Sequence, residues 1–142
     1  MAIKPATGPL VAIIRNYSTE GQWGKDMLNR ICDLVHDTVP SADIKHYQPV
    51  DDGDIPNSSD FDLVILTGGT RDLTKPVLDP WVAKIVGWIQ ETSANCPQTK
   101  VLGICWGHRS FHLPWEAGFC LERVGRWYAL SPAISQPTNI RA

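Results

Sequence analysis

Short apolar runs alternate along this chain with segments whose apolar residues recur every three or four positions. Continuous runs of strand length cover Leu10–Arg15, Phe61–Thr67 and Lys100–Ile104, and a shorter strand is expected over Ala42–Tyr47. Because the long runs do not alternate with polar residues, they suit strands that are buried on both faces, as in a parallel sheet.

Two helices are predicted between these strands. One face of the first carries the apolar residues Trp23, Met27, Ile31, Leu34 and Val35. The second begins with Asp79 as its N-cap and Pro80 at its first helical position. Its apolar face comprises Trp81, Ile85, Trp88, Ile89 and Thr92. The order of strands and helices predicts an α/β fold in which right-handed crossovers connect parallel strands.

The composition is that of one globular domain and argues against two classes of partner. The chain has 142 residues, 43% hydrophobic and 20% charged, which suits a single core. The net charge of -2 argues against nucleic acid, and apolar runs such as Leu63–Leu66 are far too short to span a membrane. No apolar segment of signal-peptide length follows Met1, and the four scattered cysteines form no metal or redox pair. A cytoplasmic location is therefore expected.

The segment Gly103–His108 carries the most informative motif, with Cys105 in the pattern Gly-Ile-Cys-Trp-Gly-His between a buried strand and a predicted helix. A nucleophile in such a sharp turn has a strained backbone, and neighbouring segments approach it closely, so the flanking residues must be small. The turn aims the thiol out of the carboxyl edge of the sheet, at a helix N-terminus that favours the thiolate. The competing interpretation is a small buried cysteine in a glycine-rich turn.

This elbow and the strand Asp62–Thr67, which runs into Gly68-Gly69, resemble two motifs of the class I glutamine amidotransferase family. The first resembles the family's nucleophile elbow and the second its oxyanion loop, and they occur in the family's order. The resemblance covers Leu10–Leu113. It implies a flavodoxin-like three-layer sandwich with a mostly parallel sheet.

The resemblance also implies roles for individual residues. In the family the cysteine attacks a carboxamide carbon, releases ammonia and leaves a glutamyl thioester, so Cys105 is the implied nucleophile. The backbone N–H groups of Gly69 and Trp106 are the implied oxyanion hole, and Gly68 is an implied substrate-binding residue. Arg109 replaces the glutamine that commonly follows Gly-His, and it either binds a substrate carboxylate or is a solvated helix residue. No metal or cofactor is expected, because Walker and EF-hand spacings are absent.

The family's catalytic base is not found in the sequence. That base is a histidine followed two positions later by an acidic residue, and no such pair follows Cys105. Residues 1–113 are therefore assigned to a glutamine amidotransferase-like domain that is incomplete at its C-terminus. Residues 114–142 are assigned to a divergent tail, in which Leu121–Leu130 is a candidate edge strand. Such a tail is expected in a compact natural variant or in the product of a truncated or frame-shifted gene. If the family's later strands are absent, the sheet has an unprotected edge, which favours a homodimer or aggregation.

Three functions remain open at this point. The first is a glutamine amidotransferase-like enzyme that passes nitrogen to a partner synthase in small-molecule biosynthesis, with secondary-metabolite biosynthesis as one candidate. The second is an acyltransferase or hydrolase that uses Cys105 with a donor other than glutamine. The third is a catalytically inactive homologue that binds or regulates a partner. The resemblance favours the first, whereas the missing base favours the other two, because the same histidine must protonate the departing amine.

Overall fold

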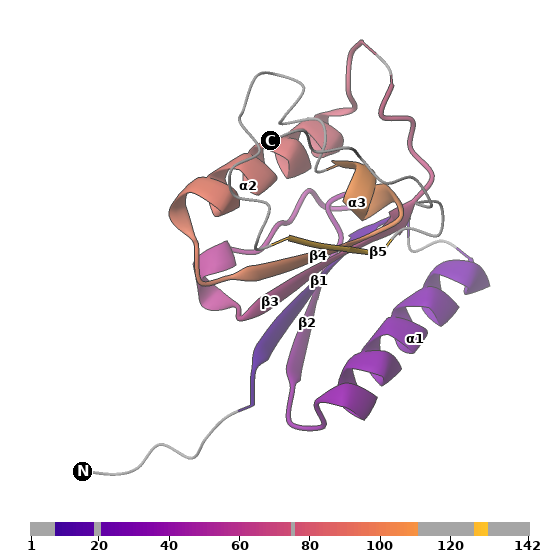
Figure 1. Cartoon of the computed structure of the whole chain (residues 1–142). Coiled ribbons are helices and arrows are strands. Elements are labelled where there is room, and N and C mark those ends of the chain that lie inside the picture. Colours follow the sequence, from indigo (N-terminus) through magenta and orange to yellow (C-terminus); the bar gives the residue numbers. More distant parts are fainter. Residues whose placement is uncertain (1–7, 19–20, 75, 111–126, 131–142) are drawn as a thin grey trace, which may run out of the picture.

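The computed structural model describes residues 8–18, 21–74, 76–110 and 127–130. The strands are β1 (Leu10–Asn16), β2 (Asp43–Tyr47), β3 (Leu63–Gly69), β4 (Lys100–Ile104) and β5 (Trp127–Leu130). The helices are α1 (Gln22–Thr38), α2 (Pro80–Asn95) and α3 (Trp106–Ser110), with a 3-10 turn, η1, at Ser58–Asp60. All strand pairs described are parallel, and the sheet order is β2-β1-β3-β4-β5 (Figure 1). This is the order of flavodoxin-like folds, so the predicted α/β sandwich is confirmed.

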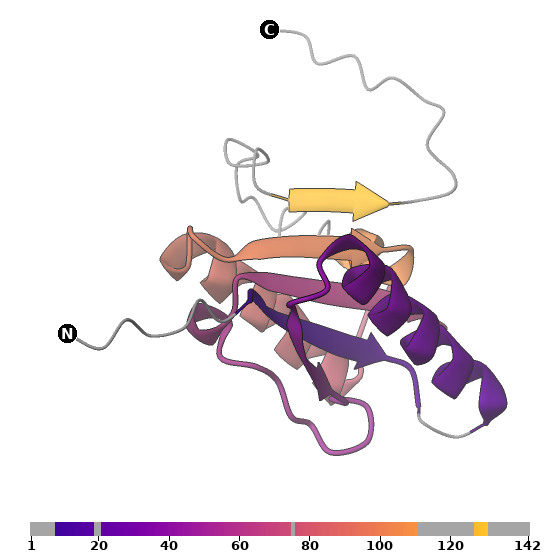
Figure 2. The same ribbon diagram turned by 90° about the horizontal axis from the view of Figure 1, so that it is seen from below.

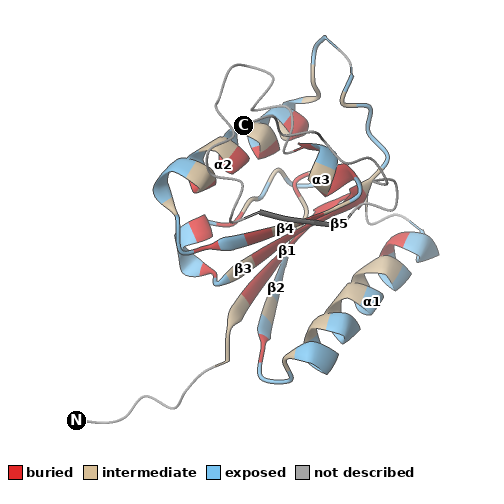
Figure 3. Ribbon diagram, in the orientation of Figure 1, coloured by how far each residue is buried: buried red, intermediate tan, exposed pale blue. Residues whose placement is uncertain are grey.

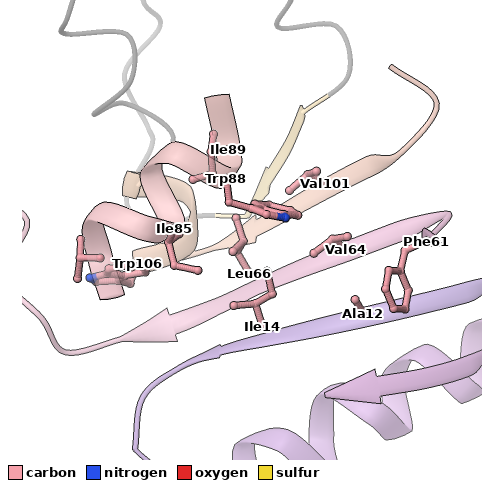
Figure 4. Close-up of a cluster of buried hydrophobic side chains, with 11 residues drawn as sticks. Ala12, Ile14, Phe61, Val64, Leu66, Ile85, Trp88, Ile89, Val101 and Trp106 are labelled. Atoms are coloured by element: carbon pink, nitrogen blue, oxygen red, sulfur yellow. The ribbon is translucent and has the colours of Figure 1, made fainter. Parts of the chain in front are cut away.

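Each face of the sheet has its own hydrophobic core, because successive residues of a strand point to opposite faces. The larger core lies between the sheet and α2, and Trp106 of α3 joins it (Figure 4). Its members are Ala12, Ile14, Phe61, Val64, Leu66, Val82, Ile85, Trp88, Ile89, Val101 and Trp106. On the other face, Val11, Ile13 and Ile65 meet the apolar side of α1. The two long helices therefore cover opposite faces of the sheet (Figure 2).

α1 contacts the sheet through a narrower stripe than the sequence predicts. The partly buried α1 residues packed there are Leu28, Ile31, Cys32 and Val35. Trp23 and Leu34, which belong to the predicted apolar face, are 56% and 62% exposed. Figure 3 shows the same result, since most of α1 has intermediate or exposed colours. The apolar stripe is wider than the contact with the sheet, so its remaining side chains stay on an open flank of the helix.

α2 follows its predicted pattern except at its cap. Ile85, Trp88, Ile89 and Thr92 are buried as expected. Asp79 does occupy the N-cap position, but its side chain makes no capping hydrogen bond. The carboxylate lies instead 3.5 Å from Nε of Arg71, because a nearby guanidinium competes with the backbone N–H groups for it. The predicted start of the helix, with Asp79 at the N-cap and Pro80 after it, is therefore confirmed, without a capping hydrogen bond from the Asp79 side chain.

β5 lies within the segment that the sequence assigns to the tail. Trp127–Leu130 pairs with β4, from Trp127 opposite Val101 to Leu130 opposite Ile104. The predicted edge strand over Leu121–Leu130 is therefore found at its C-terminal end. The remainder of the tail lies outside the described residues, and the boundary at residue 113 stays a prediction. None of the helices described is long and apolar enough to cross a bilayer.

Candidate active site

Cys105 sits in a left-handed turn between β4 and α3, with φ at 52°. It is the one residue other than glycine with positive φ in the part of the chain that the structure describes. The carbonyl of Cys105 accepts a hydrogen bond from the Arg109 amide at 3.0 Å, so the helix starts directly at the turn. For a residue that has a side chain, left-handed backbone raises the free energy by about 1–2 kcal/mol, and such strain is concentrated at functional sites. The thiol is free and exposed, which contradicts the interpretation of a buried structural cysteine.

Gly107 allows the elbow to pack directly on β3. A Cβ at this position would lie 2.3 Å from the carbonyl oxygen of Leu66 and 2.7 Å from its Cβ. Both Gly107 and Leu66 are buried, so neither can move aside without disturbing the core. The glycine therefore sets how close α3, and with it Cys105, lies to the carboxyl end of β3.

The glycine pair at the end of β3 is fixed beside the thiol. A Cβ on Gly68 would lie 3.8 Å from Cβ of Cys105, which is ordinary contact distance. A Cβ on Gly69 would lie 2.4 Å from the carbonyl oxygen of Asn16, so only glycine fits there. Asn16 also holds β3 through its backbone amide, which donates to Oγ1 of Thr67 at 3.0 Å, and through its side-chain amide, which donates to the Thr67 carbonyl at 2.9 Å. The loop is therefore held rigidly against the elbow.

Trp106 anchors the elbow on the opposite side of the sheet from the thiol. Its side chain is fully buried in the α2 core, and its ring stacks on Trp81 with centroids 5.3 Å apart. Its indole N–H donates to the carbonyl of Arg71 at 2.9 Å, which ties the loop after β3 to α3. As the first residue of a helix, Trp106 has a backbone N–H with no acceptor inside that helix.

A cavity of about 370 Å³ opens at the thiol, between α1 and the carboxyl edge of the sheet. Its walls come from α1, the end of β3 and the elbow. The lining residues are Trp23, Met27, Arg30, Ile31, Leu34, Gly68, Gly69, Thr70, Ile104 and Cys105. Parallel α/β sheets bind ligands at this edge, close to the point where the strand order reverses between β1 and β3. The exposed apolar flank of α1 is thus a wall of the cavity.

The structure brings together some of the predicted site residues and separates others. Cys105, Gly68 and Gly69 line one cavity, while their roles as nucleophile, substrate-binding residue and oxyanion hole stay predictions. Trp106 contributes backbone beside the thiol, while its side chain points into the core. Arg109 is exposed on α3 and is not among the described residues that line the cavity, so its role in binding substrate stays a prediction. Arg30, which does line the cavity, was not predicted.

The described histidines lie away from the cavity. Nε2 of His36 is 3.2 Å from the carbonyl oxygen of Ala42, and Nε2 of His46 is 3.9 Å from the sulfur of Cys32. His108 is on α3 but is also not a lining residue, and His112 lies outside the described residues. The described part of the cavity therefore offers no imidazole as a general base.

Cys105 is expected to react with iodoacetamide faster than Cys32 or Cys96. Cys105 is exposed, whereas the other two thiols are only partly accessible. Burial, assisted by the nearby Asp33 carboxylate, raises the pKa of Cys32 above its usual value. A raised pKa means a smaller thiolate fraction at any given pH, so Cys32 labelling should need more alkaline conditions. Time-resolved peptide mapping between pH 7 and 9 measures the order, and labelling of Cys32 first at neutral pH would contradict it.

Comparison with known proteins relates the fold and the elbow to one family. The chain is 32% identical over 103 residues to a glutamine amidotransferase-like protein, chry6, of Gibberella zeae, which covers 72% of this chain and 43% of that protein. It is 37% identical over 72 residues to a glutamine amidotransferase-like protein, chyE, of Penicillium rubens, covering 51% of this chain and 29% of that one. The chain thus spans less than half the length of these curated relatives. No protein-family model matches it.

The described structure agrees with this sequence similarity. The parallel sheet has the flavodoxin-like order, and a strained cysteine follows β4 beside a glycine pair that ends β3. The family predicted from the two motifs is therefore confirmed, and this chain belongs to the glutamine amidotransferase-like family.

Proposed function

We propose that Cys105 is the nucleophile of an acyl-transfer site that takes an acyl group from a carboxamide donor and releases ammonia. The observation that carries this proposal is the left-handed turn, which holds an exposed thiol over a cavity and beside Gly68. A structural cysteine gains nothing from such a strained and exposed position.

In the proposed step, Sγ of Cys105 forms a bond to the carbonyl carbon while the C–N bond of the carboxamide breaks. The thiol proton leaves with the nitrogen, so the products are a Cys105 thioester and ammonia. During the step a negative charge develops on the carbonyl oxygen. The backbone N–H groups of Gly69 and Trp106 are the proposed donors to this oxygen, and loss of one such donor costs about a hundredfold or more in rate.

Departure of ammonia requires a proton at nitrogen, which a general acid normally supplies. No imidazole lines the cavity in the described part of the chain. A thioester donor does not need this proton, because a thiolate is a good leaving group. We therefore expect this chain alone to accept an acyl group from a thioester more readily than from a carboxamide. In the whole protein, the proposed role is nitrogen transfer to a partner synthase in small-molecule biosynthesis.

The test uses the 142-residue chain and measures the mass of the intact protein after incubation with glutamine or with an acyl thioester. With the thioester we expect one acyl group per chain, and none on Cys105→Ala. With glutamine we expect acylation or ammonia release at a lower rate than acylation by the thioester. If a folded chain forms no adduct with either donor, Cys105 is not an acyl-accepting nucleophile. The hypothesis of a catalytically inactive homologue that binds or regulates a partner is then the one supported.

A further inference from the structure

We infer that the cavity beside Cys105 selects an acyl donor with an apolar body and an anionic group, and that Arg30 binds the anionic group. This inference rests on the proposed function of Cys105 and adds the chemical class of the donor. Glutamine, a small zwitterion, does not belong to this class. The inference depends on the composition of the cavity wall, on Arg30 as the one cation among the described lining residues and on the lack of acidic residues among them.

The wall opposite the glycine loop is apolar and presents side chains to open space. Trp23, Met27, Ile31 and Leu34 form it from α1, and Ile104 adds to it from β4. Three large hydrophobic side chains are exposed in the described part of the chain, and two of them, Trp23 and Leu34, line this cavity. An apolar body in the cavity would cover them, and removing such surface from water favours binding.

Trp23, in the first turn of α1, is held in place by packing against Tyr17. Its ring meets the edge of Tyr17 with centroids 5.2 Å apart and planes at 67°. Tyr17 is itself buried, and it packs against the backbone at Gly24, one residue further along the helix. The exposed indole is therefore a supported wall, a feature typical of binding sites for apolar groups.

Arg30 is the one cation among the ten lining residues, and none of those residues is acidic. The guanidinium keeps its charge at any relevant pH and pairs well with a carboxylate or a phosphate. Within the residues that the structure describes, Arg30 takes part in no ion pair. Asp26 and Asp33 lie four and three positions away on α1, but neither comes within ion-pair distance, and Asp26 accepts a hydrogen bond from Gln22 instead.

This lining suits free glutamine poorly. The α-ammonium group of glutamine requires an acidic partner or several acceptors when it leaves water, and an apolar wall supplies neither. A donor with an anionic group but no ammonium group satisfies Arg30 and covers the apolar wall at the same time. An ω-carboxyacyl group on a thioester or amide has this chemistry.

The experiment compares two donors of equal chain length, adipoyl and hexanoyl thioesters of N-acetylcysteamine. In each, the Cys105 sulfur forms a bond to the acyl carbon, the C–S bond of the donor breaks, and the thiol proton leaves with N-acetylcysteamine. Intact-mass spectrometry gives the rate of acylation, divided by the rate of the same donor with a free small thiol. We expect the adipoyl donor to react about five- to tenfold faster than the hexanoyl donor, because a hydrogen-bonded charge pair with Arg30 at a partly exposed site stabilises binding by a corresponding amount.

Matched variants separate the charge from the apolar wall. Arg30→Gln is expected to remove the adipoyl preference, whereas Lys25→Gln, which removes a positive charge from an exposed α1 position outside the cavity, should keep it. Leu34→Gln is expected to slow both donors. Val77→Gln, the same kind of change at a side chain that is 81% exposed and outside the cavity, should slow neither.

The outcomes distinguish this inference from the proposed function. A preference for the adipoyl donor that is lost in Arg30→Gln but kept in Lys25→Gln supports both the inference and the proposed function. Acylation at Cys105 with equal rates for the two donors, a preference that survives Arg30→Gln, or faster reaction with glutamine overturns the inference and leaves the nucleophile in place. No acylation of the folded chain by any donor overturns both.

Discussion

Gly107→Ala should lower the free energy of unfolding by about 2–3 kcal/mol, the upper part of the range for an added methyl group in a packed interior. The new Cβ would lie 2.3 Å from the carbonyl oxygen of Leu66, and that oxygen belongs to backbone in the central β3 strand. A flexible side chain could turn away from the methyl group, but a sheet strand cannot. α3 must therefore shift away from β3, and Cys105 must shift with it. Urea denaturation followed by circular dichroism measures the loss.

Gly87→Ala is the matched control for this change. Gly87 is an exposed residue of α2, and a Cβ there meets no atom within 4 Å. Because alanine favours a helix by about 1 kcal/mol over glycine, this variant should be as stable as the parent or more so. If Gly107→Ala proves as well tolerated as Gly87→Ala, then α3 does not pack on β3 as closely as described.

Cys105→Gly is expected to stabilise the fold by about 1 kcal/mol while removing all acylation. Glycine adopts the left-handed conformation without the steric cost that a side chain has there, and this gain exceeds the entropy that glycine loses on folding. A residue kept at a strained position against its own stability is one that has a function there. Thermal or urea denaturation gives the stability, and intact-mass spectrometry with the thioester donor gives the chemistry.

Cys105→Ala separates the two effects. Alanine keeps the Cβ that causes the strain but has no thiol, so stability should stay within about 0.5 kcal/mol of the parent. Acylation should be lost as completely as in Cys105→Gly. If glycine at position 105 destabilises the protein more than alanine does, the turn is not left-handed in solution, and the description of Cys105 as a strained residue is wrong.

The sheet could be predicted from the sequence because its strands are apolar throughout. Val11–Ile14 and Val64–Leu66 have no polar alternation, so burial between two layers was the one arrangement compatible with them. The elbow could also be predicted, because Gly107 and Gly69 stand where a side chain would collide with backbone. In both cases the local sequence and the tertiary contact impose the same constraint.

The cavity could not be predicted in the same way, because it depends on how one helix is rotated over the sheet. The sequence predicts one apolar face on this helix, yet Trp23 and Leu34 of that face are exposed. Arg30 lies three positions after Met27 and four before Leu34, so helical spacing placed it on the same face. That signal was present in the sequence, but a single charged residue at the edge of an apolar face usually extends into solvent. Only the packing of α1 shows that it borders the thiol.

The most direct test of the central claim is to locate the acyl group after reaction with the thioester donor. Brief incubation at neutral pH, followed by digestion and mass spectrometry, assigns the acyl group to individual cysteine-containing peptides. We predict a single acyl group on the peptide that contains Cys105, with the Cys32 and Cys96 peptides unmodified. Acylation spread over the four cysteines of the chain, or none at Cys105 in a folded chain, would contradict the assignment of Cys105 as the nucleophile.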